Sequence, residues 1–367
     1  MIPYWIIFLL AVLFAISQKQ RVLGPNESYY NNNLDLSWIF WIFILVIFIG
    51  LRWSIGGDWG SYKWNFWRVE TWDLSTILFK SAVDPGFGVM QWLSGEKVFN
   101  WGYHGLNTLS AIIFSYGLAK FCTSLPRPYL ALVVAIPYLI NIVAMGYMRQ
   151  SLAISFAMLA ILQLFKEENA KFLFLILIAA TFHKSAIMLF PLAIFVSTQN
   201  KLLIFFGVIL LVAVGYVAFV ESEIERFLKY YVGQGYASTG GAVRVAMLLP
   251  PAAIFILFKN RFNLSSIQTN LWLIFSYSSF PLFLAVILLD ISTTIDRIAL
   301  YALPLQLVVF SYLPDLFTKS TRIFVILLVI LYYALVMYVW LNYANHASAW
   351  VPYTSILTRL YAGEWIY

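Results

Sequence analysis

Four arginines are the residues of this chain best suited to binding an anion. They stand singly at or between apolar runs, where a charge is costly and usually functional: Arg52, Arg149, Arg244 and Arg297. A guanidinium is permanently charged and makes paired contacts with phosphate oxygens. The alternative is a structural role, as a snorkelling side chain or a positive flank of a span, which fits Arg244 best and Arg149 least.

The stretch 52–62 combines a cation, two glycines and a carboxylate where an apolar run ends. Gly56 and Gly57 let the backbone turn tightly between Arg52 and Asp58, because glycine tolerates positive φ. Asp58 is a candidate general base, or a partner that only orients Arg52. Arginine and tryptophan at a helix end are also ordinary interfacial anchors, so this second interpretation of the stretch stays open.

A polar pair, His183 and Lys184, interrupts the apolar run 172–196. Either one span carries both residues at mid-bilayer, or two short, tilted spans meet with the pair at the outer face. The second arrangement gives a consistent topology. A histidine is matched to proton transfer near neutral pH, but His183 is equally suited to a hydrogen bond between helices.

Composition defines the class of protein that must position these residues. Of 367 residues, 62% are hydrophobic and 11% are charged, whereas a soluble domain has about 45–50% apolar and about 25% charged residues. The chain is therefore expected to be a polytopic membrane protein. The net charge of +7 comes from scattered basic residues with no block that would bind nucleic acid. Cys122 is the only cysteine, which excludes an intrachain disulfide.

The apolar runs predict an all-α fold, a bundle of about 11 or 12 transmembrane helices of about 20 residues each, in a single membrane domain 1–367. The expected spans are 2–16, 37–51, 99–121, two within 128–165 that meet at Arg149 and Gln150, two short ones within 172–196, and 202–220, 243–258, 272–289, 298–313 and 323–341. The distribution of Lys and Arg favours an outward amino terminus. All four arginines and His183 then lie at the outer face.

Three segments are expected outside the membrane: a large loop 52–98, a second loop 221–241 and a tail 342–367. In the large loop, helical spacing over 59–70 predicts an interfacial helix. Asp84, Pro85 and Gly86 then break the chain, and 87–93 is too short to span. A short outer loop is expected at 290–297.

Six short motifs occur in order along the chain. They are Arg52 with Gly57-Asp58 and Tyr62, Asp84-Pro85-Gly86-Phe87, Met148-Arg149-Gln150-Ser151-Leu152-Ala153, Phe182-His183-Lys184-Ser185-Ala186, Asp296-Arg297-Ile298, and Pro352-Tyr353-Thr354-Ser355-Ile356-Leu357. Together they resemble the EpsG-type branch of the Wzy-like polysaccharide polymerases, the O-antigen and exopolysaccharide polymerases. The resemblance implies a bacterial inner-membrane enzyme that joins lipid-linked oligosaccharide repeat units at the periplasmic face.

The donor implied by this resemblance is a glycan on undecaprenyl pyrophosphate, and the acceptor is a sugar hydroxyl that a general base activates. Asp58 and His183 are the catalytic candidates. The expected substrate-binding residues are Arg52, Tyr62, Arg149, Gln150, Lys184, Arg244, Arg297 and, through the resemblance alone, Tyr353. No metal or other cofactor is expected, because the chain lacks an Asp-x-Asp pair and a P-loop and its histidines are dispersed.

The expected partners are the lipid-linked oligosaccharides and membrane lipids, with flippase and chain-length regulator proteins as candidates. Two other functions stay open. A glycan O-acyltransferase would use His183 as its base and would leave chain length unchanged. A lipid-linked oligosaccharide flippase would have a cation-lined central cavity between two repeats, and no internal repeat is evident.

Overall fold

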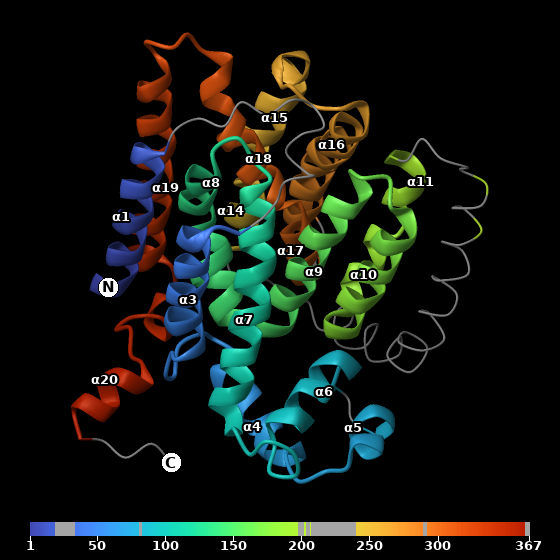
Figure 1. Ribbon diagram of the computed structural model, residues 1–367, viewed down its shortest axis with the longest axis vertical. Coiled ribbons are helices and arrows are strands. Elements are labelled where there is room, and N and C mark those ends of the chain that lie inside the picture. The colour runs from blue at the N-terminus through green and yellow to red at the C-terminus, as the bar shows by residue number, and fades with distance from the viewer. Residues whose placement is uncertain are drawn as a thin grey trace.

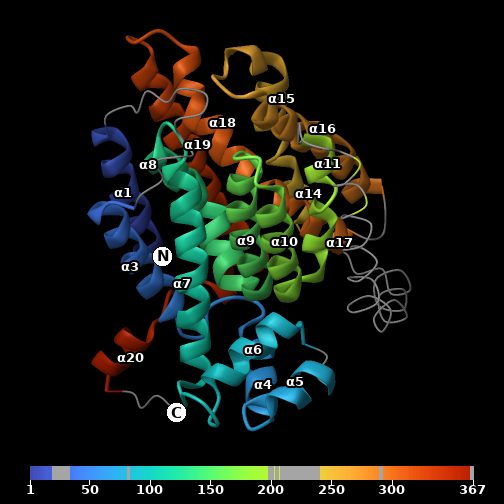
Figure 2. The same cartoon turned by 45° about the vertical axis from the view of Figure 1, so that its right-hand side comes forward.

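The protein is helical throughout the part of the chain that the structure describes. This computed structural model describes residues 1–18, 34–80, 83–196, 202, 206, 240–288 and 292–363. No strand occurs in these ranges, and a single antiparallel bridge joins Arg52 to Ser355. The helices form one bundle, with α4, α5, α6 and α20 gathered at one end, here called the loop end (Figures 1 and 2). The predicted all-α membrane fold is confirmed.

The first part of the chain contains two apolar helices, three short helices and one long helix. These are α1 (Ile2–Ser17), α3 (Leu36–Gly50), α4 (Trp59–Val69), α5 (Leu74–Lys80), α6 (Pro85–Ser94) and α7 (Gly102–Thr123). Helix α6 has 10 residues, about 15 Å, and is too short for a hydrocarbon core of about 30 Å. It begins at Pro85. Proline is tolerated there because the backbone N–H groups of a helix's first turn have no partner within the helix.

The middle of the chain alternates helices with irregular turns. It contains α8 (Pro128–Ala135), the π-helix η1 (Ile136–Ala144), α9 (Met148–Leu164), α10 (Asn169–Phe182), the 3₁₀-helix η2 (Lys184–Leu189) and α11 (Leu192–Val196). Arg149 lies in the first turn of α9, close to the predicted meeting of two spans. His183 has an extended backbone that ends α10. The chain therefore breaks at His183, as two short spans require, and α11 lies toward the end opposite α6 (Figure 1).

The last part contains the four longest apolar helical segments. The elements are α14 (Gly241–Ala246), α15 (Leu249–Phe258), η5 (Lys259–Arg261), α16 (Ser266–Leu288), α17 (Ser292–Ala299), η6 (Leu300–Ala302), α18 (Pro304–Tyr312), η7 (Leu313–Leu316), α19 (Arg322–Tyr343), η8 (Ala347–Ala349) and α20 (Ile356–Tyr361). The loop predicted over 290–297 is wrong from residue 292 onward, because α17 is helical there. Its charged Asp296 and Arg297 find partners inside the bundle, so the helix can continue.

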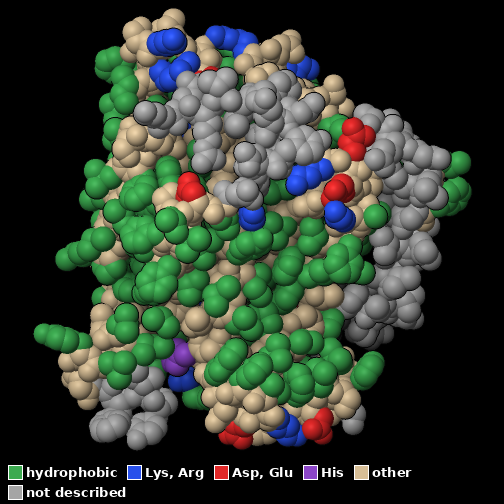
Figure 3. All heavy atoms as spheres, in the orientation of Figure 1, with side chains coloured by type: hydrophobic (Ala, Val, Ile, Leu, Met, Phe, Trp, Pro, Cys, Tyr) green, Lys and Arg blue, Asp and Glu red, His purple; other side chains and the backbone are tan. Residues whose placement is uncertain are grey.

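Four helical segments are long and apolar enough to cross a membrane: Gly241–Arg261, Ser266–Leu288, Ile295–Leu316 and Arg322–Tyr343. Six shorter apolar helices of 10–17 residues accompany them in the described ranges. Apolar side chains form a broad band across the visible face of the molecule, and Lys and Arg gather mainly at the end opposite the loop end (Figure 3). The protein is thus a multi-pass membrane protein. Apart from residues 202 and 206, the predicted span 202–220 lies outside the described residues, as does nearly all of the loop 221–241.

The segment after α19 folds back onto the end of α3. Tyr353 Oη donates a hydrogen bond to the Phe48 carbonyl at 2.7 Å, and the Trp53 N–H donates to the Thr354 carbonyl at 2.9 Å. Tyr353 also stacks on the Phe48 ring, with centroids 5.0 Å apart. This part of the expected outer tail therefore braces the stretch that begins at Arg52.

The turn before Asp58 depends on one glycine. Gly56 has φ of +107°, and a Cβ there would lie 2.5 Å from the Met145 carbonyl oxygen. A Cβ on Gly57 would meet only the Trp350 ring at 3.9 Å, an ordinary contact. The expectation that both glycines are needed for the turn is therefore corrected to Gly56 alone.

Candidate active site

An arginine–carboxylate pair joins α9 to the start of α6 at the loop end. Arg149 Nη1 lies 2.7 Å from Asp84 Oδ2, with the Asp84 side chain 5% exposed and that of Arg149 34% exposed. The Arg149 guanidinium is also 6.0 Å from the Tyr62 ring centroid, and the Arg149 backbone N–H donates to Tyr62 Oη at 3.5 Å. Arg149 is held on one side and remains accessible on the other.

Asp58 stands next to this pair without a partner of its own. It is the N-cap residue of α4, yet its side chain makes no capping hydrogen bond. Its carboxylate makes no hydrogen bond or ion pair with any residue that the structure describes. Burial raises the pKa of the Asp58 carboxyl, and the positive charges of Arg297 and Arg149 oppose that rise. Asp58 is thus a half-buried carboxylate within electrostatic reach of two arginines.

A hydrogen-bonded chain runs from Arg297 through His183 to Tyr301. Arg297 Nη1 lies 3.3 Å from His183 Nε2, and His183 Nδ1 lies 2.6 Å from Ser185 Oγ. Because a guanidinium only donates, Nε2 is the acceptor and Nδ1 carries the ring hydrogen. Ser185 Oγ then donates to Tyr301 Oη at 3.2 Å. In this arrangement the Nε2 lone pair is occupied, and His183 positions Arg297.

Gln150 and Lys184 flank this chain. Gln150 Nε2 donates to the Arg297 carbonyl oxygen at 2.5 Å, which ties α9 to α17. Lys184 follows His183 directly, and its side chain makes no hydrogen bond or ion pair with the described residues. Its ammonium group is therefore not engaged by a described residue, and its charge acts on His183.

A second ion pair lies one residue before Arg297. Arg244 Nε is 3.1 Å from Asp296 Oδ1, and Arg244 Nη2 is 2.5 Å from Asp296 Oδ2. Both side chains are largely buried. Tyr147 is close enough to Arg244 and Asp58 for both charges to act on its hydroxyl group. Tyr147 thus links this second pair to the site around Asp58.

Arg52 is not brought into the site, although the sequence suggested it as a phosphate ligand. Its side chain is 1% exposed, and it donates to the carbonyls of Ile49 and Ile55 at 2.5 and 3.3 Å. It has no acidic partner among the described residues, so Asp58 does not orient it. Burial and carbonyl partners fit a structural role for Arg52, and the hydrogen bond of Tyr353 to α3 fits the same role.

Sequence reasoning missed five residues that shape the site: Asp84, Ser185, Tyr147, Asp296 and Tyr301. From the sequence, Asp84 belongs to a chain break before Pro85 and to one of the six motifs, with no role of its own. Asp296 lay in a recognised motif with no role assigned. The signal that was available for both is a lone carboxylate beside an apolar run, which needs a cationic partner when buried.

The structure thus defines a class: a multi-pass helical membrane protein with a polar, arginine-containing site at one end of its bundle. Within the described residues, no group of three or more His, Cys, Asp or Glu side chains could hold a metal ion. The model of the EpsG family matches residues 35–355, which is most of the chain. The chain therefore belongs to the EpsG family, a Wzy-like, polymerase-associated family of polysaccharide biosynthesis. Neither a curated protein nor a solved structure matches it.

Proposed function

We propose that this protein is a polysaccharide polymerase acting in O-antigen, capsule or exopolysaccharide synthesis. It joins oligosaccharide repeat units carried on undecaprenyl pyrophosphate, by glycosyl transfer at the periplasmic face of the inner membrane. Its membership of the EpsG family supports the class of activity. The observation that carries the chemistry is Asp58, an unpartnered carboxylate in the field of Arg149 and Arg297.

In the proposed reaction, Asp58 removes the proton from the acceptor sugar hydroxyl. The acceptor oxygen bonds to the anomeric carbon of the donor glycan, and the bond from that carbon to the pyrophosphate oxygen breaks. The electron pair leaves with the pyrophosphate. A general base is most effective when its pKa approaches the working pH, so the raised pKa of Asp58 favours this role.

The cations of the site stabilise the charge that develops on the leaving group. Arg149 is held by Asp84 and Arg297 by His183, so neither guanidinium has to reorganise as the reaction proceeds. Lys184 adds a third positive charge, which acts on the neighbouring His183. Donors fixed in this way bind a transition state better than mobile ones, because folding has already ordered them and no further conformational entropy is lost during the reaction.

An O-acyltransferase that uses His183 as its base has less support. Such a base needs a lone pair directed at the substrate hydroxyl, and His183 Nε2 accepts from Arg297 instead. The hydrogen on Nδ1 is engaged with Ser185 Oγ. The geometry therefore favours Asp58 over His183 as the proton acceptor.

The test is deletion of the gene followed by gel analysis of the surface polysaccharide. Loss of long chains, with single repeat units still made and exported, is the expected result. Complementation with the wild-type gene restores long chains, and complementation with Asp58→Asn at equal abundance does not. Unchanged chain length would overturn polymerisation, loss of an acyl group alone would favour the acyltransferase, and failure to export single units would favour a flippase.

A further inference from the structure

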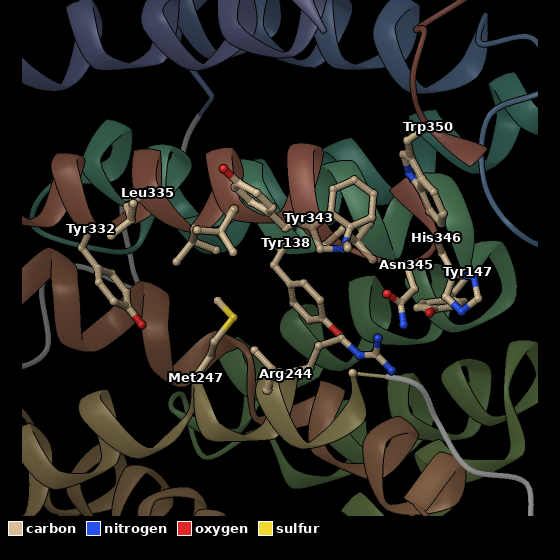
Figure 4. A pocket seen from close by; sticks show the side chains of 17 residues that line it. Tyr138, Tyr147, Arg244, Met247, Tyr332, Leu335, Tyr343, Asn345, His346 and Trp350 are labelled. Carbon is tan, nitrogen blue, oxygen red and sulfur yellow. The ribbon is translucent and has the colours of Figure 1, made fainter. Parts of the chain in front are cut away.

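A groove of about 450 Å³ lies between η1, α14 and α19. Polar side chains gather at one end of it, namely Arg244, Tyr138, Tyr147, Asn345 and His346 (Figure 4). The other end is formed by Met247, Leu335 and Tyr332, with Val336 and Val339 on the same wall. The groove thus has a polar end and a mainly apolar end, and its lining is complementary to an amphipathic ligand.

The groove opens toward the side of the bundle that would face lipid. Helix α19 forms one wall, and only 22% of its apolar stretch is buried within the protein. Two residues of this wall, Leu335 and Val339, are 57% and 47% exposed. A ligand from the bilayer can therefore reach the groove laterally.

The length of the groove matches one leaflet of a membrane. Its lining runs along α19 from Tyr343 near the loop end to Tyr332. The helical steps from Tyr332 to Tyr343 rise about 16 Å, roughly half of a hydrocarbon core of about 30 Å. The polar end lies where lipid headgroups would be, and the apolar end lies near the bilayer centre.

The polar end of the groove is continuous with the candidate active site. Arg244 lines the groove and pairs with Asp296, the residue before Arg297. Tyr147 lines the groove and is also near Asp58. A headgroup at this end would lie next to the residues proposed for glycosyl transfer.

We propose that this groove holds the polyisoprenyl chain of the donor, with its pyrophosphate beyond the polar end of the groove, toward Arg297. The inference rests on the proposed function, since that function supplies the lipid-linked donor. Continuity with the site, where Arg149 and Arg297 carry the positive charge, favours an anionic lipid whose head is the reacting group. The apolar wall of α19 binds the chain by burial of hydrocarbon and not by hydrogen bonds.

Photocrosslinking of the purified full-length protein tests this placement. The probe is a polyisoprenyl pyrophosphate with a photoreactive group in its chain and no sugar. We expect crosslinks in peptides of η1, α14 and α19, competed by unlabelled polyisoprenyl pyrophosphate. Inorganic pyrophosphate and phosphatidylglycerol at the same concentration should compete weakly. Equal competition by phosphatidylglycerol would mean that the groove holds bulk lipid, and would overturn the proposal.

A pair of tryptophan substitutions on α19 provides the matched control. Val339→Trp places an indole in the groove and should lower crosslinking about tenfold, because the ring occupies the space of the chain. Leu331→Trp lies on the same helix, is 65% exposed and does not line the groove, and should crosslink as the wild type does. Equal crosslinking of both variants would overturn the placement.

The binding readout separates this inference from the proposed function. Crosslinking in the groove together with unchanged chain length in the deletion strain would contradict polymerisation and leave the lipid site standing. Loss of long chains together with crosslinks spread evenly over all lipid-facing helices would contradict the groove and leave polymerisation standing.

Discussion

Two clusters of arginine and aspartate lie at opposite ends of the bundle and differ in how their carboxylates are used. At the end opposite the loop end, here called the basic end, Asp315 accepts hydrogen bonds from Arg127 Nη2 and Nη1, each at 2.7 Å, and lies 3.3 Å from Arg322. At the loop end, Asp84 is paired with Arg149, but Asp58 has no partner among the described residues.

The difference separates an ion pair that holds helices together from a site that can do chemistry. Asp315 pairs with Arg322 of α19 and with Arg127, which directly precedes α8. Arg127 also donates a hydrogen bond to the Ser311 carbonyl. That cluster has little capacity left for a ligand. Asp58 keeps its capacity to accept a proton, which a purely structural carboxylate does not need. Changing each acid to its amide should therefore have opposite consequences.

The largest expected effect is on activity at Asp58. Asp58→Asn should lower the rate of polymer formation by about 10²- to 10⁴-fold, since the amide cannot take the proton of the acceptor hydroxyl. The measurement is polymer formed per molecule of protein from lipid-linked repeat units. Asp73→Asn in the same loop alters an exposed carboxylate and should retain full activity. Full activity of Asp58→Asn would remove Asp58 from the mechanism.

At the basic end the same change should act on stability. Asp315→Asn leaves Arg127, whose side chain is 3% exposed, with a buried and uncompensated charge, which destabilises by about 3 kcal/mol. The midpoint of thermal unfolding should fall, while activity per folded molecule stays unchanged. Lys97→Met breaks the exposed Lys97–Asp73 pair and should move the midpoint very little. An activity loss in folded Asp315→Asn would contradict the structural role of this cluster.

A third prediction concerns Arg149, which has both a structural partner and an exposed side. Arg149→Gln should lower activity on the order of 10²-fold, the loss typical of one fixed donor to a developing charge. Because this variant also leaves Asp84 buried and unpaired, the control is the double variant Arg149→Gln with Asp84→Asn. The double variant should regain stability and stay inactive. Recovery of activity in it would show that Arg149 serves only Asp84.

The smallest effect concerns the stability of the resting protein. The raised folded-state pKa of Asp58 means that folding favours its protonated form, so its contribution to stability is present at low pH and is lost as pH rises through the folded pKa. Asp58→Asn should therefore raise the unfolding midpoint slightly at neutral pH, and this gain should disappear in acid. A lowered midpoint, as expected for Asp315→Asn, would mean that Asp58 has a stabilising partner.

The local features of the fold could be predicted from the sequence because they depend on neighbouring residues. Long apolar runs predicted the membrane class and most of the helices, and a proline marked the start of α6 at Pro85. The break at His183 was also predicted, since two polar residues interrupt a continuous apolar run. The prediction of a loop over 290–297 was wrong from residue 292 onward. It relied on the local charges Asp296 and Arg297, which lie inside a helix because distant residues supply their partners.

What the sequence by itself determined is a multi-span helical membrane protein of the EpsG family, with cations at the edges of its apolar runs. The tertiary structure decided which of them share a site. Arg149 meets Asp84 across 65 positions, and Arg297 meets His183 across 114. Arg52 lies close in sequence to Asp58 and yet is buried away from it. Hydrophobicity is a local property of the chain, whereas the partner of a charge depends on how distant helices pack.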